Sequence, residues 1–532
     1  MLGYIRSRFL IFILLIVSGS MMLLSCEYEQ QNSQEDEQLV PLIPEALNAM
    51  SFSISTDDSI AQAYFDQGLQ LGYAFGRGDA RRSFIEAQQL DSTCAMCYWG
   101  EAWARGPYLN NQWYVQPGAY DAVKKAMELA EAGHTNAMEK SLITALDTRY
   151  NKEDDLTNRA QLDTAYVQAM EKVYQEFPGH PEITTLYAEA LFILEPRRGE
   201  RSLADPDVKR IVEVLEEAMK ETGMHPGLCH FYIHVLEASD QPERALSCAE
   251  YIGDSIPGAS HINHMPSHIW NQVGEWEKSV SANINAWHTD LKADRGEAFE
   301  IYEGHNLHML AFTAAMDGQG AISIQAAKDL AKITGSNVQH LLALIRFGRF
   351  EEVLELVSRP DGETEGGIWE FAQGYAQLKT GNKDTAQDYL ESLKSIANNS
   401  EDNYNRHPAQ KLLGVLGYIL EGEIFRKDKS YIKAVKAFEE AVTIYDQFEY
   451  SEPEPLPFSP RHWLGSVLID MGDYSKAEEV YRRQLEHHPN NGWSLFGLKE
   501  ALKRQGKPEE EVENDFLESW KRSEVWIESA QF

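Results

Sequence analysis

Basic residues are scarce in this chain of 532 residues, in which 48 lysines and arginines stand against 83 acidic residues. The formal net charge is therefore −35. Such a surface repels phosphate backbones, so we expect no nucleic-acid partner. It equally disfavours membrane adhesion through basic patches. Hydrophobic residues still make up 43% of the chain, which is enough for a large core, and the length favours several domains or one repeat array.

Established catalytic motifs are also absent. The sequence contains no G-x-S-x-G nucleophile elbow, no H-E-x-x-H metal motif and no phosphate-binding P-loop. Strand-like alternation of polar and apolar residues is nearly absent as well, whereas helical periodicity runs through most of the chain. The sequence therefore predicts an all-α fold, and no motif by itself supports turnover.

Cysteine is limited to five residues. Cys94 and Cys97 form a C-x-x-C pair, and Cys229 and Cys248 are far from it in sequence. The pair could be redox-active, bind a metal, form a disulfide, or simply place small buried side chains at a helix start. No second C-x-x-C is present to complete a zinc site.

One long apolar run, from Phe9 to Leu24, lies at the N-terminus and follows Arg6 and Arg8. It ends in Leu-Leu-Ser before Cys26, which resembles the signal of a bacterial lipoprotein. The resemblance implies a signal peptide at residues 1–25, acylation of Cys26 and an acidic tether at 26–58. It also implies a chain anchored by lipid to a membrane of the bacterial cell envelope, on the periplasmic side or the cell surface. A single membrane anchor is the alternative, although small polar residues thin the run.

Small and large residues recur in two segments at fixed helical spacings. The first set is Gly68, Leu71, Ala80, Phe84 and Ala87; the second is Gly465, Leu468, Ala477, Tyr481 and Pro489. These patterns resemble the tetratricopeptide (TPR) repeat, a helix–turn–helix of 34 residues. Four glycine turns of the same type punctuate the chain at Gly274, Gly348, Gly381 and Gly472. The resemblance implies a right-handed α-helical superhelix with a concave groove that binds a protein or a small molecule.

We expect three repeat regions: 59–222 with insertions, a histidine-rich region at 223–335, and 336–532 with a capping helix after Glu509. Loops are predicted where the repeat pattern breaks, at 106–113, 194–208 and 451–457. Trp520 and Trp526 should face inward from the capping helix. The C-terminal repeats carry no histidine set and are predicted to be plain superhelix.

Nine of the sixteen histidines fall between His225 and His308. Most are three or four residues apart, the spacing that places side chains on one face of a helix. In the repeat register implied by the resemblance, seven of them occupy positions that line the concave groove. These seven are His230, His234, His261, His264, His268, His305 and His308. Pro266 suits the first turn of a helix, which places His264 near a helix start.

One zinc ion needs about three or four protein ligands, so seven imidazoles are more than one ion can use. The sequence thus leaves three arrangements open: one metal with spare groups, two separate sites, or a two-metal centre. Imidazole ligands with few carboxylates favour zinc, copper or nickel over calcium or magnesium. We expect copper or zinc, and less strongly iron. A histidine-lined groove that binds a peptide or small acid without metal is the alternative.

Two functions follow from these candidate ligands. The first is a lipid-anchored envelope protein whose groove holds a metal, and with it a ligand or partner, without turnover. The second is a metalloenzyme, either an oxidoreductase or a hydrolase, with Glu237 or Glu303 as the general base. Arg201, together with Arg197 and Arg198, could overhang the groove and bind an anion, or lie in a solvated loop.

Overall fold

The computed structural model describes residues 40–112, 115–152, 158–195 and 200–532. The predicted signal peptide and Cys26 lie outside these ranges, as do Arg197 and Arg198. Within the described ranges, no helix combines the length and apolar character that crossing a membrane requires.

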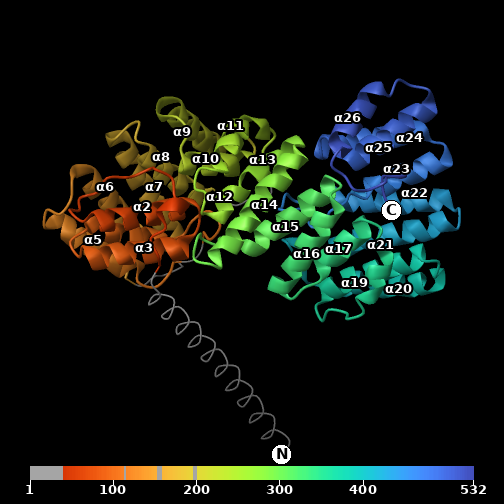
Figure 1. Ribbon diagram of the computed structural model, residues 1–532, viewed down its shortest axis with the longest axis horizontal. Coiled ribbons are helices and arrows are strands. Elements are labelled where there is room, and N and C mark those ends of the chain that lie inside the picture. The colour runs from red at the N-terminus through yellow and green to blue at the C-terminus, as the bar shows by residue number, and fades with distance from the viewer. Residues whose placement is uncertain (1–39, 113–114, 153–157, 196–199) are drawn as a thin grey trace, which may run out of the picture.

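Helices build nearly all of the described chain, which confirms the predicted all-α fold (Figure 1). The N-terminal region comprises η1 (Pro44–Ala46), α2 (Ser59–Tyr73), α3 (Arg77–Leu90), α4 (Ala95–Ala104), α5 (Ala119–Glu131), α6 (Ala137–Asp147), α7 (Arg159–Glu176), α8 (Pro181–Leu194) and α9 (Pro206–Thr222). The central region comprises α10 (Pro226–Leu236), η3 (Pro242–Ala245), α11 (Leu246–Ile252), α12 (Ser260–His264), α13 (Pro266–Val273), α14 (Trp276–Ala293), α15 (Glu303–Met316) and α16 (Gly320–Thr334).

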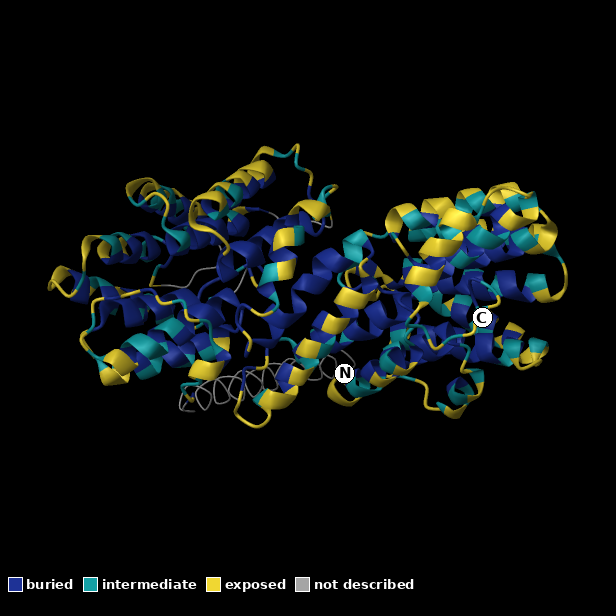
Figure 2. Ribbon diagram, turned by 45° about the horizontal axis from the view of Figure 1, so that its top comes forward, coloured by how far each residue is buried: buried dark blue, intermediate teal, exposed yellow. Residues whose placement is uncertain are grey.

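The C-terminal region comprises α17 (Val338–Arg346), α18 (Phe350–Glu355), α19 (Glu363–Lys379), α20 (Lys383–Asn399), β1 (Asn403–Tyr404), β2 (His407–Pro408), α21 (Ala409–Lys427), α22 (Tyr431–Tyr445), α23 (Arg461–Met471), α24 (Tyr474–His487), α25 (Gly492–Gln505) and α26 (Glu510–Trp520). β1 and β2 form one short antiparallel hairpin. Exposed residues gather on the outer turns of the array, whereas the helices through its middle are largely buried (Figure 2).

The predicted repeat contacts are present at both ends of the array. A Cβ atom on Gly68 of α2 would lie 2.8 Å from the ring of Phe84 on α3. A Cβ on Gly465 of α23 would collide with the ring of Tyr481 on α24. Gly274 has a φ of +76°, in the left-handed region, and ends α13 before α14 begins at Trp276. The small residues thus let paired helices approach closely, and the glycine turns reverse the chain between them.

Residues 40–58, predicted as the second part of a solvated tether, are packed against the first helices instead. Val40, Ala46 and Phe52 are buried there. The buried amides of Gln67 and Gln70 hold the extended backbone: Gln67 Oε1 accepts from the backbone N–H of residue 43 at 3.0 Å, and Gln70 Oε1 from that of residue 48 at 2.8 Å. Two polar side chains on an otherwise buried helix face therefore find their partners in this segment.

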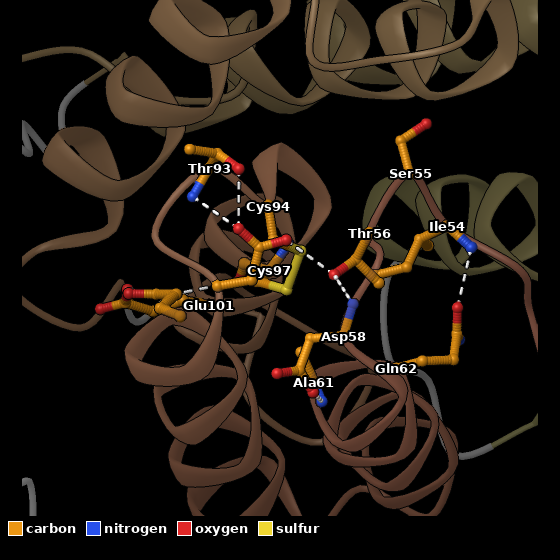
Figure 3. Close-up of a disulfide and its surroundings, with 12 residues drawn as sticks. Ile54, Ser55, Thr56, Asp58, Ala61, Gln62, Thr93, Cys94, Cys97 and Glu101 are labelled. Atoms are coloured by element: carbon orange, nitrogen blue, oxygen red, sulfur yellow. Dashed lines mark hydrogen bonds between the residues drawn. A yellow bond between two sulfur atoms is a disulfide. The ribbon is translucent and has the colours of Figure 1, made fainter.

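Both cysteine pairs among the described residues are disulfides. Cys94 and Cys97 are joined at the start of α4, where Cys94 Sγ also accepts a hydrogen bond from the Cys97 N–H (Figure 3). Both are fully buried. Cys229 of α10 is joined to Cys248 of α11 and so ties the histidine-bearing α10 to its neighbour.

The C-terminal helices return to the middle of the chain. Trp493 of α25 is fully buried, and its Nε1–H donates to the Ala315 carbonyl of α15 at 3.0 Å. The Trp276 Nε1–H of α14 donates to the Pro489 carbonyl at 2.9 Å. Arg522, just after α26, forms an ion pair with Asp317 at 2.7 Å. These contacts join the last repeats to the helices that carry the central histidines.

A helix, α26, begins directly after Glu509, where a capping helix was predicted, but one of the two tryptophans differs from the prediction. Trp520 packs edge-on against Trp493, with ring centroids 4.9 Å apart. Trp526 is 85% exposed, because it lies in the non-helical tail after α26 and has no core to meet. The inward position predicted for Trp526 is therefore wrong.

Buried Trp493 and exposed Trp526 should differ in how much their replacement by alanine destabilises the protein. Trp493→Ala should lower the free energy of unfolding by about 3–5 kcal/mol, because it leaves a large cavity and an unpaired carbonyl. Trp526→Ala should change it by less than about 0.5 kcal/mol. Urea denaturation of both variants checks this; equal effects would mean that the C-terminal helices do not pack on α15 in solution.

Candidate metal centre

Four helices carry the histidines predicted as ligands. His230 and His234 lie on α10, His261 and His264 on α12, and His268 on α13, and all five are buried. His305 and His308 lie on α15. Every residue of α10 and α12 is buried, so none of the imidazoles on these two helices faces solvent as part of a polar helix surface. Pro266 begins α13, as predicted, and separates it from α12.

Six of the seven histidines form two sets of three. The first consists of His230, His234 and His261, whose ligand atoms all lie within 4.8 Å of one another. The Nε2 atoms of His230 and His234 are 3.1 Å apart. The ring of Phe75 packs against this set, with centroids 4.3 Å from His230 and 5.5 Å from His234.

The second set consists of His264, His268 and His305, which also lie within 4.8 Å. Here the Nε2 atom of His264 is 2.7 Å from that of His268 and 3.1 Å from that of His305. The two sets adjoin, since the ring centroids of His261 and His264 are 5.6 Å apart. Helical spacing thus arranged the pairs within α10 and across α12–α13, and packing of α15 supplied the third member of the second set.

The hydrogen-bond partner of each Nδ1 atom shows which ring nitrogen carries the proton. Nδ1 of His230 lies 2.6 Å from the Tyr73 carbonyl, which can only accept, so this nitrogen donates. Nδ1 of His264 lies 2.7 Å from Asn283 Oδ1, and the amide nitrogen of Asn283 donates elsewhere. Nδ1 of His234 lies 3.0 Å from a Glu237 oxygen. In each neutral imidazole the Nε2 atom therefore carries the lone pair.

The Nε2 lone pairs of His230 and His234, which lie 3.1 Å apart, repel unless a cation lies between them. Tetrahedral ligands about 2.0–2.1 Å from a zinc ion are about 3.3 Å apart, close to this separation. His261 adds a second indication, because it is only 2% exposed and both of its ring nitrogens lack a hydrogen-bond partner. The residues present therefore fit a metal ion in each set.

Glu237 lies between the two sets. One of its oxygens accepts from His234 Nδ1 at 3.0 Å, and the other lies 2.8 Å from His268 Nδ1. A carboxylate in this position orients imidazoles so that their other nitrogen faces the metal. Glu237 was predicted as a general base, and in this geometry both of its oxygens contact imidazole nitrogens.

Sequence reasoning missed a second carboxylate at the centre. Glu452 Oε2 lies 2.9 Å from His268 Nδ1. Glu452 belongs to the predicted loop 451–457 between α22 and α23. It follows His268 by about 180 residues in the sequence. No local spacing could reveal this contact, although the run of acidic and proline residues at 452–455 marked the loop as unusual.

Two predicted site residues lie apart from the sets. His308 is on α15 but belongs to neither group, and its side chain bonds Gln339 instead. Glu303 begins α15 among Glu300 and Asp294; burial, and then repulsion from these acids, raise the pKa of its carboxyl. Glu303 precedes His305 by two residues, which places it on the opposite side of α15, whereas His308 shares the face of His305 and is set apart by its bond to Gln339.

Burial and mutual repulsion control protonation of the apo centre. Burial first, and then the neighbouring imidazoles, hold the pKa values of His230, His261 and His264 well below the usual range. Burial acts in the same direction on His268, but the carboxylates of Glu452 and Glu237 outweigh it and raise its pKa to about 10.

A cavity of about 400 Å³ opens onto both sets. Its described lining comprises Tyr108, Asn110, Asn111, Arg201, His234, Glu237, His261, His268, Tyr302, His305, Asn405, Arg406, Tyr450, Ser451 and Glu452. Tyr302, Asn405 and Arg406 have φ values of +61°, +46° and +68°, in the left-handed region. Phe75, against the first set, has a φ of +63°. Such backbone strain in non-glycine residues gathers at functional sites, and here it surrounds the histidines.

The comparison with protein families matches residues 463–492, which span most of α23 and all of α24, to the tetratricopeptide repeat. The chain contains a tetratricopeptide repeat. The resemblance predicted from Gly465, Leu468, Ala477 and Tyr481 is thereby confirmed at this repeat. No curated protein sequence matches the chain.

Three solved structures align with most of this chain. The P58(IPK) TPR domain is 13% identical, covering 84% of this chain and 98% of its own, with a TM-score of 0.22. Human IFIT1, solved as a dimer with m7Gppp-AAAA, is 12% identical, with coverages of 92% and 99% and a TM-score of 0.31. Cut9–Hcn1 of the APC/C is 13% identical, with coverages of 88% and 76% and a TM-score of 0.28. At these scores the alignments support no inference about ligands of this chain.

The apo protein should become less stable as the pH falls from 7.5 to 5.5. The folded state keeps His230, His261 and His264 neutral, whereas the unfolded chain takes up protons through about pH 6.5, so stability present above that pH is lost below it. Thermal unfolding of chelator-treated protein at both pH values measures the change. His261→Asn should reduce the pH dependence, and His134→Asn, at an exposed position, should leave it unchanged. A melting temperature that does not fall would contradict these pKa directions.

Proposed function

We propose that this TPR protein is a metalloenzyme that binds two transition-metal ions, one in each three-histidine set, and acts as an oxidoreductase. The observation that carries the proposal is the convergence of Nε2 atoms within both sets beside one cavity. A helical array needs no such arrangement for its stability. Burying several imidazoles against one another instead costs free energy that a bound cation would offset.

The ligand chemistry favours copper over the other metals. All six candidate ligands are imidazole nitrogens, which suit copper, zinc and iron, and copper has the highest affinity among these divalent ions. Three protein ligands leave each ion a position for an exogenous ligand, on the side of the cavity. When bound, copper would supply one-electron and oxygen chemistry.

Hydrolysis with zinc is less well supported by the described residues. It would profit from a free carboxylate as general base. The carboxylates that line the cavity are Glu237 and Glu452. Glu237 contacts His234 and His268, and Glu452 contacts His268 and the Tyr450 hydroxyl, so neither is uncommitted. A metal-storage role is disfavoured because the ligand sets are incomplete and open to a cavity.

We further infer that the protein is exported and held to the bacterial cell envelope by a lipid on Cys26. The lipoprotein-like sequence that ends at Cys26 supports this localisation, and two buried disulfides fit an oxidising compartment. The repeat array remains suited to a protein partner on its outer surface, in addition to the ligand in the cavity.

Elemental analysis of protein purified without a tag, lipid anchor or chelator should find two equivalents of copper per chain. The His264→Ala/His268→Ala double variant should lose the ion of the second set and weaken the first, because Glu237 then loses one of its imidazole partners. His308→Ala is the matched control on α15 and should retain both ions. A double variant that keeps two equivalents would overturn the proposed centre.

Replacement of Glu237, the carboxylate that contacts both histidine sets, should weaken the binding of both ions. Glu237→Gln removes the charge that orients His234 and His268, so metal affinity should fall by about 10- to 100-fold. Glu303→Gln makes the same chemical change outside the cavity and should leave affinity unchanged. Competition with a chelator of known affinity measures both variants; equal affinities would show that Glu237 does not position the ligands.

A further inference from the structure

Arg201 is an unusual neighbour for a metal centre. It follows the loop after α8 and lines the cavity, although it is only 5% exposed. The predicted alternative of a solvated loop is therefore wrong for this residue. Its Nη1 donates to the His234 carbonyl at 2.7 Å, which fixes the guanidinium beside the first histidine set.

The charge of this guanidinium is only partly balanced. Among the described residues it forms an ion pair with Glu237, whose Oε1 is 3.9 Å from Nη1, and Glu237 already contacts two imidazoles. The Arg201 Nε atom is buried and has no hydrogen-bond partner in the described part of the chain. A buried arginine normally has its donors satisfied, and a planar carboxylate is the group that best matches its paired N–H donors.

The cavity as a whole favours an anion. Among its described lining residues, Arg201 and Arg406 balance the charges of Glu237 and Glu452. The six candidate metal ligands are imidazoles, which in their neutral ligand form bring no negative charge. With two divalent ions bound, the cavity therefore carries an excess of positive charge, and an anionic ligand would offset it.

The other residues that line the cavity suit a small ligand that contains an aromatic ring. Three tyrosines face the cavity, and the hydroxyls of Tyr108 and Tyr302 lie 2.8 Å apart. Asn110, Asn111 and Asn405 add amide groups around them. Aromatic walls with a few polar groups are typical of small-molecule sites, and about 400 Å³ is at the lower end of their volumes.

We propose that this cavity binds a small aromatic carboxylate, with its carboxylate group paired to Arg201 and its ring among the tyrosines beside the metal centre. The inference rests on the proposed function for the identity of the site, but the pairing with Arg201 is independent of which metal is bound. Arg201 is thus the residue that selects acids over neutral molecules of the same shape.

Isothermal titration with benzoate and benzamide tests the pairing, because the two probes share shape but not charge. Copper-loaded and metal-free protein are both titrated, and metal content is measured on the same samples. Benzoate should bind wild type at least about tenfold more tightly than benzamide. Arg201→Gln should weaken benzoate by about tenfold or more and leave benzamide unchanged. Arg295→Gln, at an exposed position, is the control.

Each outcome decides the proposal. Equal affinities for benzoate and benzamide would overturn the proposal. Benzoate binding that Arg201→Gln leaves intact would also overturn it. If that remaining binding requires copper, benzoate binds the metal and not Arg201. Should Arg201→Gln fail to fold, Arg201→Lys retains the charge without the planar fork and should still weaken benzoate. Absence of copper with Arg201-dependent binding of benzoate would reject the metalloenzyme and keep the carboxylate site.

Discussion

The centre depends on one kind of interaction, the hydrogen bond from a buried imidazole Nδ1–H to an oxygen acceptor. The acceptors are the Tyr73 carbonyl, Asn283, Glu237 and Glu452. Each bond satisfies a polar group that would otherwise be costly to bury, and each turns the Nε2 atom toward the neighbouring imidazoles. The same bonds therefore stabilise the core and create the ligand sets.

These acceptors come from distant parts of the array. Tyr73 ends α2, Asn283 lies on α14, and Glu452 belongs to the loop between α22 and α23. The C-terminal repeats, predicted as plain superhelix, thus supply a carboxylate and part of the cavity wall. Their return to α14 and α15 through Trp493 and Arg522 is what brings that loop to the histidines. The proposed centre is consequently a property of the closed array and not of the histidine-rich repeats alone.

Prediction succeeded where the physics is local. Spacings of three and four residues place His230 beside His234 and His264 near His268, because one helical turn separates them. In the repeat register His305 and His308 both line the groove, whereas the structure places His305 with His264 and His268, and His308 bonds Gln339 of α17. These two residues share one face of α15, so the difference arises from what each meets in the packed array and not from helical periodicity. Glu452 lies too far away in sequence for any local spacing to reveal it.

The helical fold, its glycine turns, the repeat at 463–492 and the helical spacing of the histidines can be predicted from sequence. Each follows from backbone geometry and side-chain size within one or two helical turns. The grouping of six imidazoles into two sets, the contacts of Glu237 with both sets and the burial of Arg201 beside them emerge from the folded chain. Those arrangements depend on the distances and rotations between helices, which arise from packing among residues far apart in the chain.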